Sequence, residues 1–215
     1  MRIYFIGAHS TGKTTIARYT AKRMGLPLIT EVARGVLAEL ELSLDTLRTD
    51  LDTVTTYQRE VLLRQIATEQ RHPQGFVSDR AFDNIAYAAH HTLATKEFMS
   101  SELFSDYIET LRQGVIFFVR PHKELLKTDG VRAAVAWEEV LVIDGMVKLL
   151  LEIYDMRYIP MTCVNMQERV RMVDTIVHLH RTAPENGSVL SLEESATAAA
   201  TGSSRRRSGT RRRRS

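Results

Sequence analysis

The N-terminal segment contains the pattern G-x-x-x-x-G-K-[ST] directly after a short apolar run. Gly7, Gly12, Lys13 and Thr14 supply the pattern, and residues 3–6 are the apolar run. Such a run predicts a buried strand, and the two glycines let the following backbone curl so that successive N–H groups face an anion. A helix predicted over residues 13–24 adds the positive end of its dipole. The segment therefore predicts a phosphate-binding loop; the alternative is an ordinary strand-to-helix turn that contains glycine.

The predicted loop also indicates its ligands. In loops of this type the lysine bridges the β- and γ-phosphates of a nucleoside triphosphate, and the hydroxyl after it binds Mg²⁺. We therefore expect ATP and Mg²⁺ as cofactors, with Thr14 as a metal ligand. The residues expected to bind the nucleotide are Gly7, Ala8, His9, Ser10, Thr11, Gly12, Lys13, Thr14 and Thr15.

Strands and helices are predicted to alternate after the loop. Short apolar runs predict strands at residues 3–6, 26–30, 75–79, 114–119 and 159–164. Continuously apolar strands are typical of parallel sheets whose two faces are both covered by helices. We expect an α/β domain with a doubly wound, parallel five-stranded sheet, the fold of P-loop NTPases. Ligands of such sheets bind beyond the carboxyl ends of the strands.

Charge is distributed unevenly along the chain. The formal net charge is +3, yet residues 205–215 hold seven arginines and no acid, which leaves −4 for residues 1–204. Residues 183–204 are rich in small and polar residues, a composition that cannot offset the entropy of ordering. We predict a domain over residues 1–182 and a disordered arginine-rich tail over 183–215. Such a tail suits the phosphates of DNA, whereas the alternative is a solubilising or incidental tail.

Composition also narrows the class of protein. A chain of 215 residues with 44% hydrophobic residues is long enough for one well-buried domain. Its one cysteine, Cys163, lies in an apolar run and excludes an internal disulfide framework. We see no stretch of about 18 apolar residues and no signal-peptide pattern. The expected location is the cytoplasm.

Polar residues follow the second and third predicted strands. Asp79 comes directly after the apolar residues 76–77 and Ser78, as in a Walker B element, where a carboxylate orients Mg²⁺ or its waters. Asp79 is therefore the second candidate metal ligand, and the neighbouring Arg80 is suited to hold a phosphate by paired hydrogen bonds. Glu31 follows the second strand. The alternatives are a helix N-cap for Asp79 and a first-turn acid favoured by the helix dipole for Glu31.

These segments, taken in order, resemble the P-loop nucleoside and nucleotide kinases. The resemblance rests on the phosphate loop, on residues 31–34, on residues 79–83, and on residues 128–132, and it extends over residues 1–180. The groups that the chain resembles are the thymidylate-kinase-like enzymes, the nicotinamide riboside kinase domain, and the phage kinases that act on 5-hydroxymethyluracil in DNA. The resemblance implies that Glu31 is the acceptor-side base, that Arg80 engages phosphates, and that Arg132 is a lid arginine over the transferring phosphate.

The sequence thus predicts an ATP-dependent kinase that transfers the γ-phosphate to a hydroxyl of a nucleotide-type acceptor. The predicted catalytic residues are Lys13, Glu31, Asp79, Arg80 and Arg132. The arginine-rich tail favours hydroxymethyluracil in phage DNA as the acceptor, which would place the protein in the host cytoplasm. A metabolic nucleoside, dNMP or nicotinamide riboside kinase and a regulatory P-loop ATPase are the alternatives. The oligomeric state stays open.

Overall fold

The computed structural model of the chain describes residues 1–30, 32–40, 51–86, 99–126 and 136–182. The chain forms two compact units, Met1–Val170 and Arg171–Ser215. Two predicted catalytic residues, Glu31 and Arg132, lie outside the described residues, as does the predicted tail at 183–215. The predicted domain boundary after residue 182 stays a prediction.

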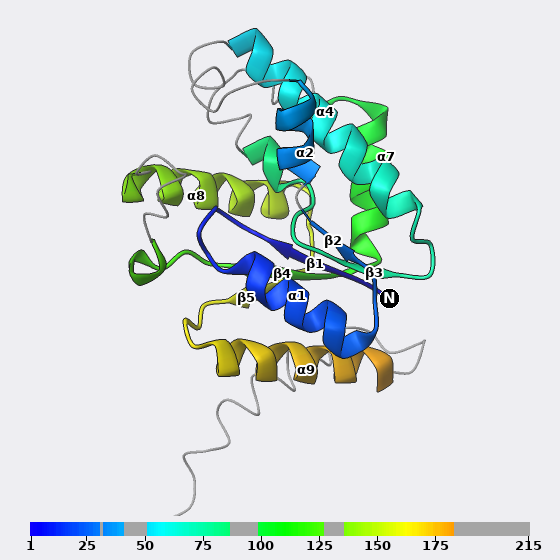
Figure 1. Cartoon of the computed structure of the whole chain (residues 1–215), viewed down its shortest axis with the longest axis vertical. Helices are drawn as coiled ribbons and strands as arrows, with labels where there is room; N and C mark the ends of the chain where they lie inside the picture. The colour runs from blue at the N-terminus through cyan, green and yellow to red at the C-terminus, as the bar shows by residue number, and fades with distance from the viewer. Residues whose placement is uncertain (31, 41–50, 87–98, 127–135, 183–215) are drawn as a thin grey trace, which may run out of the picture. The chain divides into compact units, whose positions relative to one another are not determined.

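The first unit is built on one sheet of five parallel strands. Their order across the sheet is β2-β3-β1-β4-β5, so β1 lies at the centre (Figure 1). The predicted parallel five-stranded α/β fold is confirmed. Because every strand runs in the same direction, the residues that follow the strands gather at one edge of the sheet. The strands are β1 (Arg2–Ile6), β2 (Leu28–Ile29), β3 (Phe76–Ser78), β4 (Val115–Val119) and β5 (Ile159–Met161).

The outer strands are shorter than the apolar runs that predict them. β5 ends at Met161, three residues before the end of the predicted run, and Met161 is also the residue that pairs with Val119 at the end of β4. An edge strand has only one neighbour, and β5 ends where its neighbour β4 ends. β2, at the other edge, is two residues long and ends at Ile29, opposite Ser78 at the end of β3.

Helices cover both faces of the sheet. Tyr4, Ile6 and Phe118 lie in a core that also includes residues of α4, α7 and α8. Alternate residues point to the opposite face, where the rings of Phe5 and Phe117 stack with their centroids 5.1 Å apart. The helix α1 packs against β1, β2 and β3. The helices are α1 (Lys13–Met24), α2 (Val32–Glu39), α4 (Leu51–Gln70), α7 (Glu102–Arg112), α8 (Trp137–Ile153), α9 (Met166–Thr182) and the 3-10 turn η1 (Lys123–Leu125).

The segment after β3 begins as a turn and not as a helix. Helical structure begins at Asp83, and the Oδ1 atom of Asp83 accepts a hydrogen bond from the Ala81 N–H at 2.8 Å. Asp79 lies four residues before this helical segment. Asp79 is therefore not the N-cap of this helical segment.

Among the described helices, none combines the length and the apolar composition that crossing a bilayer requires.

Candidate phosphate-binding site

The loop between β1 and α1 has the backbone conformation that its glycines permit. Gly7 has a φ of +137°, and a Cβ atom there would lie 2.5 Å from the Val119 carbonyl oxygen of β4. Gly12 has a φ of +85° and is the residue from which α1 begins. The N-cap residue Gly12 has no side chain that could accept a hydrogen bond from the first N–H groups of α1. An uncapped helix start of this kind is suited to bind an anion.

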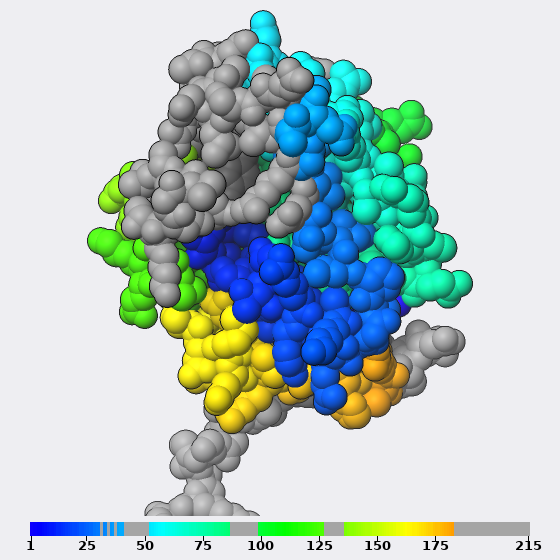
Figure 2. Space-filling model, in the orientation of Figure 1, coloured from blue at the N-terminus to red at the C-terminus, as the bar shows by residue number. Residues whose placement is uncertain are grey.

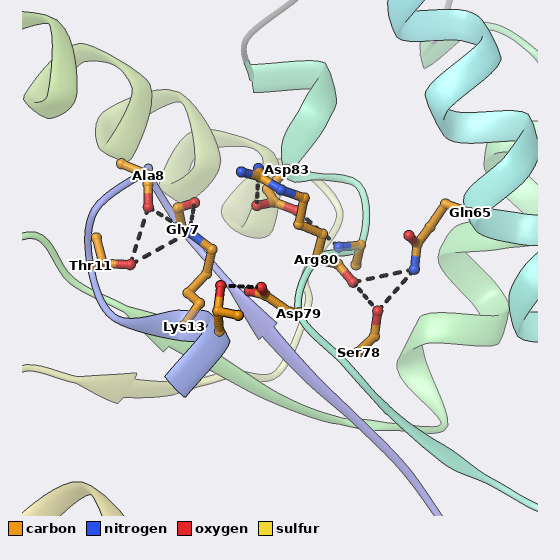
Figure 3. A network of polar contacts seen from close by, with 11 residues as sticks. Gly7, Ala8, Thr11, Lys13, Gln65, Ser78, Asp79, Arg80 and Asp83 are labelled. Carbon is orange, nitrogen blue, oxygen red and sulfur yellow. Dashed lines mark hydrogen bonds and ion pairs between the residues drawn. The ribbon is translucent and has the colours of Figure 1, made fainter. Parts of the chain in front are cut away.

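The side chain of Lys13 folds back over the loop. Its Nζ atom donates to the carbonyl oxygens of Gly7 at 2.9 Å and Ala8 at 2.5 Å, and it lies 3.5 Å from the hydroxyl of Thr11. The Thr11 hydroxyl in turn donates to the Ala8 carbonyl at 3.1 Å. Lys13 is 5% exposed. The ammonium group thus lies among the polar atoms of Gly7, Ala8 and Thr11 in the loop (Figure 3).

Thr14 and Asp79 meet across the sheet edge. The Thr14 hydroxyl donates to the Oδ2 atom of Asp79 at 2.5 Å, although 65 residues separate them in the sequence. The Oδ1 atom of Asp79 is buried and has no hydrogen-bond partner among the described residues. Burial raises the pKa of Asp79, while the neighbouring charge of Lys13 and the hydrogen bond from Thr14 act in the opposite direction. The structure therefore brings together the two residues that the sequence predicts as metal ligands.

These two side chains fit Mg²⁺. The cation prefers oxygen ligands and usually keeps several waters and substrate phosphates in its shell, so one hydroxyl and one carboxylate suffice. The unpartnered Oδ1 atom of Asp79 gives the site a buried oxygen that a cation would satisfy. Across the described part of the chain, no cluster of three or more His, Cys, Asp or Glu side chains could hold a metal by itself. The arrangement fits a cation that arrives with a nucleotide.

Arg80 lies beside Asp79 and is held by a buried acid. Its guanidinium Nη1 atom lies 3.4 Å from the Oδ2 atom of Asp83, whose side chain is fully buried. The backbone of Arg80 is held as well, because the Ser78 hydroxyl donates to its carbonyl at 2.7 Å, and Gln65 donates to the Ser78 hydroxyl at 2.9 Å (Figure 3). The Arg80 side chain remains 29% exposed. The Arg80 side chain can therefore contact a ligand while its backbone stays fixed.

The buried carboxylate of Glu69 is linked through Gln65 to Ser78, the residue that precedes Asp79 and Arg80. Glu69 of α4 accepts hydrogen bonds from the hydroxyls of Tyr4 at 2.9 Å and Tyr107 at 2.6 Å, and from Gln65 at 2.8 Å. Burial raises the pKa of Glu69, and the three hydrogen bonds oppose that shift. The group connects α4 to β1 and α7. Tyr107 lies in the hydrophobic core.

A second ion pair lies at the same sheet edge. Arg120, directly after β4, contacts the Oδ2 atom of Asp144 of α8 at 2.7 Å, and its guanidinium carbon lies 4.9 Å from the centre of the Phe118 ring. Asp144 is 2% exposed, and burial raises its pKa, against the charges of Arg120, Lys148 and Lys13. Sequence reasoning does not identify this pair, because the two residues belong to no motif and lie 24 positions apart.

Arg169 is a further residue near the phosphate loop that the sequence does not indicate. It is 1% exposed, and its Nη1 atom donates to the carbonyl oxygen of Thr11 in the phosphate loop at 2.6 Å. The contact joins residues 158 positions apart. No local pattern marks an arginine that binds a backbone carbonyl so far away in the chain.

Solved structures of similar fold include several kinases. The chain aligns with deoxyadenosine kinase from M. mycoides over 83% of its own length and 99% of the kinase, at 13% identity and a TM-score of 0.57. It aligns with shikimate kinase from Acinetobacter baumannii over 85% of its own length and 95% of the kinase, at 14% identity and a TM-score of 0.53. These likenesses establish a kinase-like P-loop fold.

A third similar structure is that of NadR in complex with NAD and AMP-PNP. The TM-score is 0.61 at 19% identity, over 86% of this chain and 51% of the NadR chain. The chain thus corresponds to about half of NadR. No curated protein matches the chain significantly in sequence.

The sequence itself matches one protein-family model. The match extends over residues 2–169, and the family is described as an AAA domain. These residues include the phosphate loop, the Asp79–Arg80 turn and Arg169, which are the parts of the site described above. The chain belongs to this AAA domain family.

Proposed function

We propose that the protein is an ATP-dependent phosphotransferase that acts on a hydroxyl group of a nucleotide-type acceptor. The observation that carries the proposal is the meeting of Lys13, Thr14 and Asp79 at the carboxyl edge of the sheet, where the Thr14 hydroxyl lies 2.5 Å from the Asp79 carboxylate. A lysine cation, a hydroxyl and a buried carboxylate are the groups that bind the phosphates of a nucleoside triphosphate together with its cation. The kinases among the structures of similar fold support the same reaction class.

The proposed reaction moves one phosphoryl group. The acceptor oxygen attacks the γ-phosphorus, the bond from that phosphorus to the β–γ bridging oxygen breaks, and ADP leaves with the electron pair. The proton of the acceptor hydroxyl passes to a carboxylate, for which we propose Glu31. Because the transition state is loose, the protein contributes mainly alignment and charge stabilisation.

Each residue of the site has a proposed role in that step. Lys13 stabilises charge that develops on the β- and γ-phosphate oxygens. Thr14 and Asp79 would hold Mg²⁺, which supplies neutralising charge at the same oxygens. Arg80 orients a phosphate on the acceptor side, and Arg132 closes over the γ-phosphate. The roles of Glu31 and Arg132 rest on the resemblance to P-loop kinases.

The proposed function also includes the identity of the acceptor. The structures of similar fold include a deoxyadenosine kinase with dCMP and dCDP, NadR with NR, and a shikimate kinase with shikimate, so this fold serves several hydroxyl acceptors. The seven arginines among residues 205–215 favour an acceptor within DNA, and we propose the 5-hydroxymethyl group of hydroxymethyluracil. A free nucleoside, a dNMP or nicotinamide riboside is the alternative.

The test is a transfer screen with ATP labelled at the γ-phosphate. Acceptors are nucleosides, dNMPs, nicotinamide riboside, and duplex DNA with and without hydroxymethyluracil, and a reaction without acceptor measures hydrolysis. Label in an acceptor supports the kinase. ATP hydrolysis at the same rate with and without every acceptor would contradict it and favour a regulatory ATPase.

A further inference from the structure

Arg169 is a buried arginine next to the phosphate loop. Its guanidinium makes two hydrogen bonds to backbone carbonyls: Nη1 donates to Thr11 at 2.6 Å and Nε donates to Cys163 at 2.8 Å. Thr11 belongs to the phosphate loop, and Cys163 to the segment between β5 and α9. In Figure 2, atoms in the yellow that the bar gives to residues 160–168 lie beside the dark blue atoms of the N-terminal segment. Arg169 therefore connects the phosphate loop to that segment.

The phosphate loop leaves space for this guanidinium. A Cβ atom at Gly12 would lie 2.8 Å from the Nη1 atom of Arg169, closer than such atoms approach without displacement. Gly12 is favoured by its positive φ, and a side chain at this position would also displace the Arg169 guanidinium. The guanidinium forms part of the wall of the loop.

The charge of Arg169 has no anionic partner among the described residues. The ion pairs of that part of the chain do not include Arg169, and its Nη2 atom is buried without a hydrogen-bond partner. Burial lowers the pKa of Arg169, but an arginine stays protonated at neutral pH. A buried cation without a counter-ion is costly. The charge balance at this position is therefore completed from outside the described protein groups.

The peptide between Thr11 and Gly12 connects this cation to the ligand side of the loop. Its carbonyl accepts the bond from Arg169, while its N–H belongs to Gly12, the residue from which α1 begins. Hydrogen bonding at a carbonyl polarises the peptide and strengthens its N–H as a donor. A charge behind the loop can thus act on an anion in front of it.

We propose that Arg169 is a positioning residue for the nucleotide, whose buried charge is balanced by the polyphosphate chain that the loop binds. The inference rests on the proposed function, since it requires a nucleoside di- or triphosphate in the loop. It adds a cation outside the motif that distinguishes ligands by their number of phosphates. Arg169 acts through the Thr11–Gly12 peptide and does not itself contact the reacting atoms.

The experiment measures the affinity of ATP, ADP and AMP for three variants of the full chain. Arg169→Met removes the charge while keeping much of the volume, and Arg169→Lys keeps the charge but cannot span both carbonyls. Arg171→Met, two residues further along α9 and exposed, is the matched control. Isothermal titration calorimetry at one salt concentration gives each Kd, and steady-state kinetics give KM and kcat.

We expect Arg169→Met to weaken ATP binding about tenfold or more, ADP binding less, and AMP binding least. Arg169→Lys should recover a large part of the ATP affinity, and Arg171→Met should match the parent. KM for ATP should rise while kcat stays within about threefold, because the interaction acts on bound nucleotide and not specifically on the transition state. Should Arg169→Met fail to fold, Arg169→Gln replaces it.

Equal losses for all three nucleotides in both Met and Lys variants would overturn the inference and leave Arg169 as a loop anchor only. Unchanged affinities would also overturn it. A parent protein that binds none of the nucleotides would instead contradict the proposed function, so the two failures are distinguishable.

Discussion

At the scale of single residues, Lys13 is the side chain on which phosphoryl transfer is expected to depend most. We predict that Lys13→Ala lowers γ-phosphoryl transfer by at least about 100-fold, because the proposed role of Lys13 is to stabilise charge on the β- and γ-phosphate oxygens. The fold should persist, with a far-UV circular dichroism spectrum like that of the parent. Lys22→Ala, an exposed lysine on the same helix α1, is the control. Activity of Lys13→Ala within tenfold of the parent would contradict the loop assignment.

The two carboxylates of the site should respond differently to the metal. Asp79 accepts the hydrogen bond from Thr14, whereas the role of Glu31 is proposed from resemblance alone. We expect Asp79→Asn and Glu31→Gln both to lower kcat, and only Asp79→Asn to raise the Mg²⁺ concentration that gives half-maximal activity. Magnesium titrations of both variants make the comparison. The reverse pattern would show that the roles are exchanged.

The raised pKa of Asp79 also predicts how the free energy of unfolding depends on pH. Burial raises its folded pKa above the ordinary value of 3.8, so the folded state binds the proton more tightly than the unfolded state does. The free energy of unfolding of the parent therefore falls as pH rises from the unfolded pKa through the folded pKa. Asn does not titrate, so Asp79→Asn should gain stability relative to the parent as pH rises from 4 upwards. Urea unfolding of both proteins from pH 4 to pH 7 measures this difference; a constant or shrinking difference would contradict it.

At the scale of elements, the Glu69 cluster joins α4 to β1 and α7 by hydrogen bonds to one buried carboxylate. We predict that Tyr107→Phe lowers the free energy of unfolding by about 1–3 kcal/mol, since it removes a buried hydrogen bond to that group. Tyr19→Phe on α1, where the side chain is 36% exposed, is the matched control and should change stability little. Chemical denaturation gives both values. A loss as large in Tyr19→Phe would mean that the effect is not specific to the cluster.

The elements also show what the sequence could predict. All five strands are predictable because helices cover both faces of the sheet, so each strand is a continuous apolar run. The ends of the strands could not be predicted in this way. β5 stops at Met161, where its partner β4 ends, and an apolar run in the sequence does not show where the neighbouring strand ends. The start of the helix after β3 is also displaced, since Ser78 and Asp83 hold a turn around Arg80.

Part of the candidate site could also be predicted from the sequence, and part of it could not. The phosphate loop is predictable because its residues are contiguous and each has a backbone or ligand requirement of its own. The pairing of Thr14 with Asp79 follows from the parallel sheet, which gathers residues that follow its strands. The contact between Arg169 and Thr11 could not be predicted, since it joins a side chain to a backbone oxygen 158 residues away and leaves no pattern in residue types.

At the scale of the whole molecule, the prediction concerns the arginines among residues 205–215 and the acceptor. If DNA is the substrate, truncation after Gly202 should raise KM for hydroxymethyluracil DNA and flatten its dependence on salt, because those arginines release counterions from the phosphates. The value of kcat should stay nearly unchanged, since the truncation leaves residues 1–182, and with them every proposed catalytic residue, intact. Kinetics at several salt concentrations, with full-length and truncated protein, test this.

The control for the truncation is a free nucleoside acceptor, which offers no phosphate lattice and whose kinetics should not change. If the free nucleoside is much the better acceptor for both proteins, the DNA acceptor is wrong and a metabolic nucleoside or nucleotide kinase is the better description.

The hydrogen bonds of Lys13 set a threshold for what can enter the loop. An ammonium group has three N–H donors, and in this structure it lies within 3.5 Å of three acceptors that the loop itself provides, Gly7 O, Ala8 O and the Thr11 hydroxyl. Any anion that binds Lys13 must therefore displace these three acceptors, which are part of the loop itself. A single inorganic phosphate gains little by such an exchange, whereas a polyphosphate gains several contacts at once. We therefore expect the loop to bind a polyphosphate in preference to a single small anion.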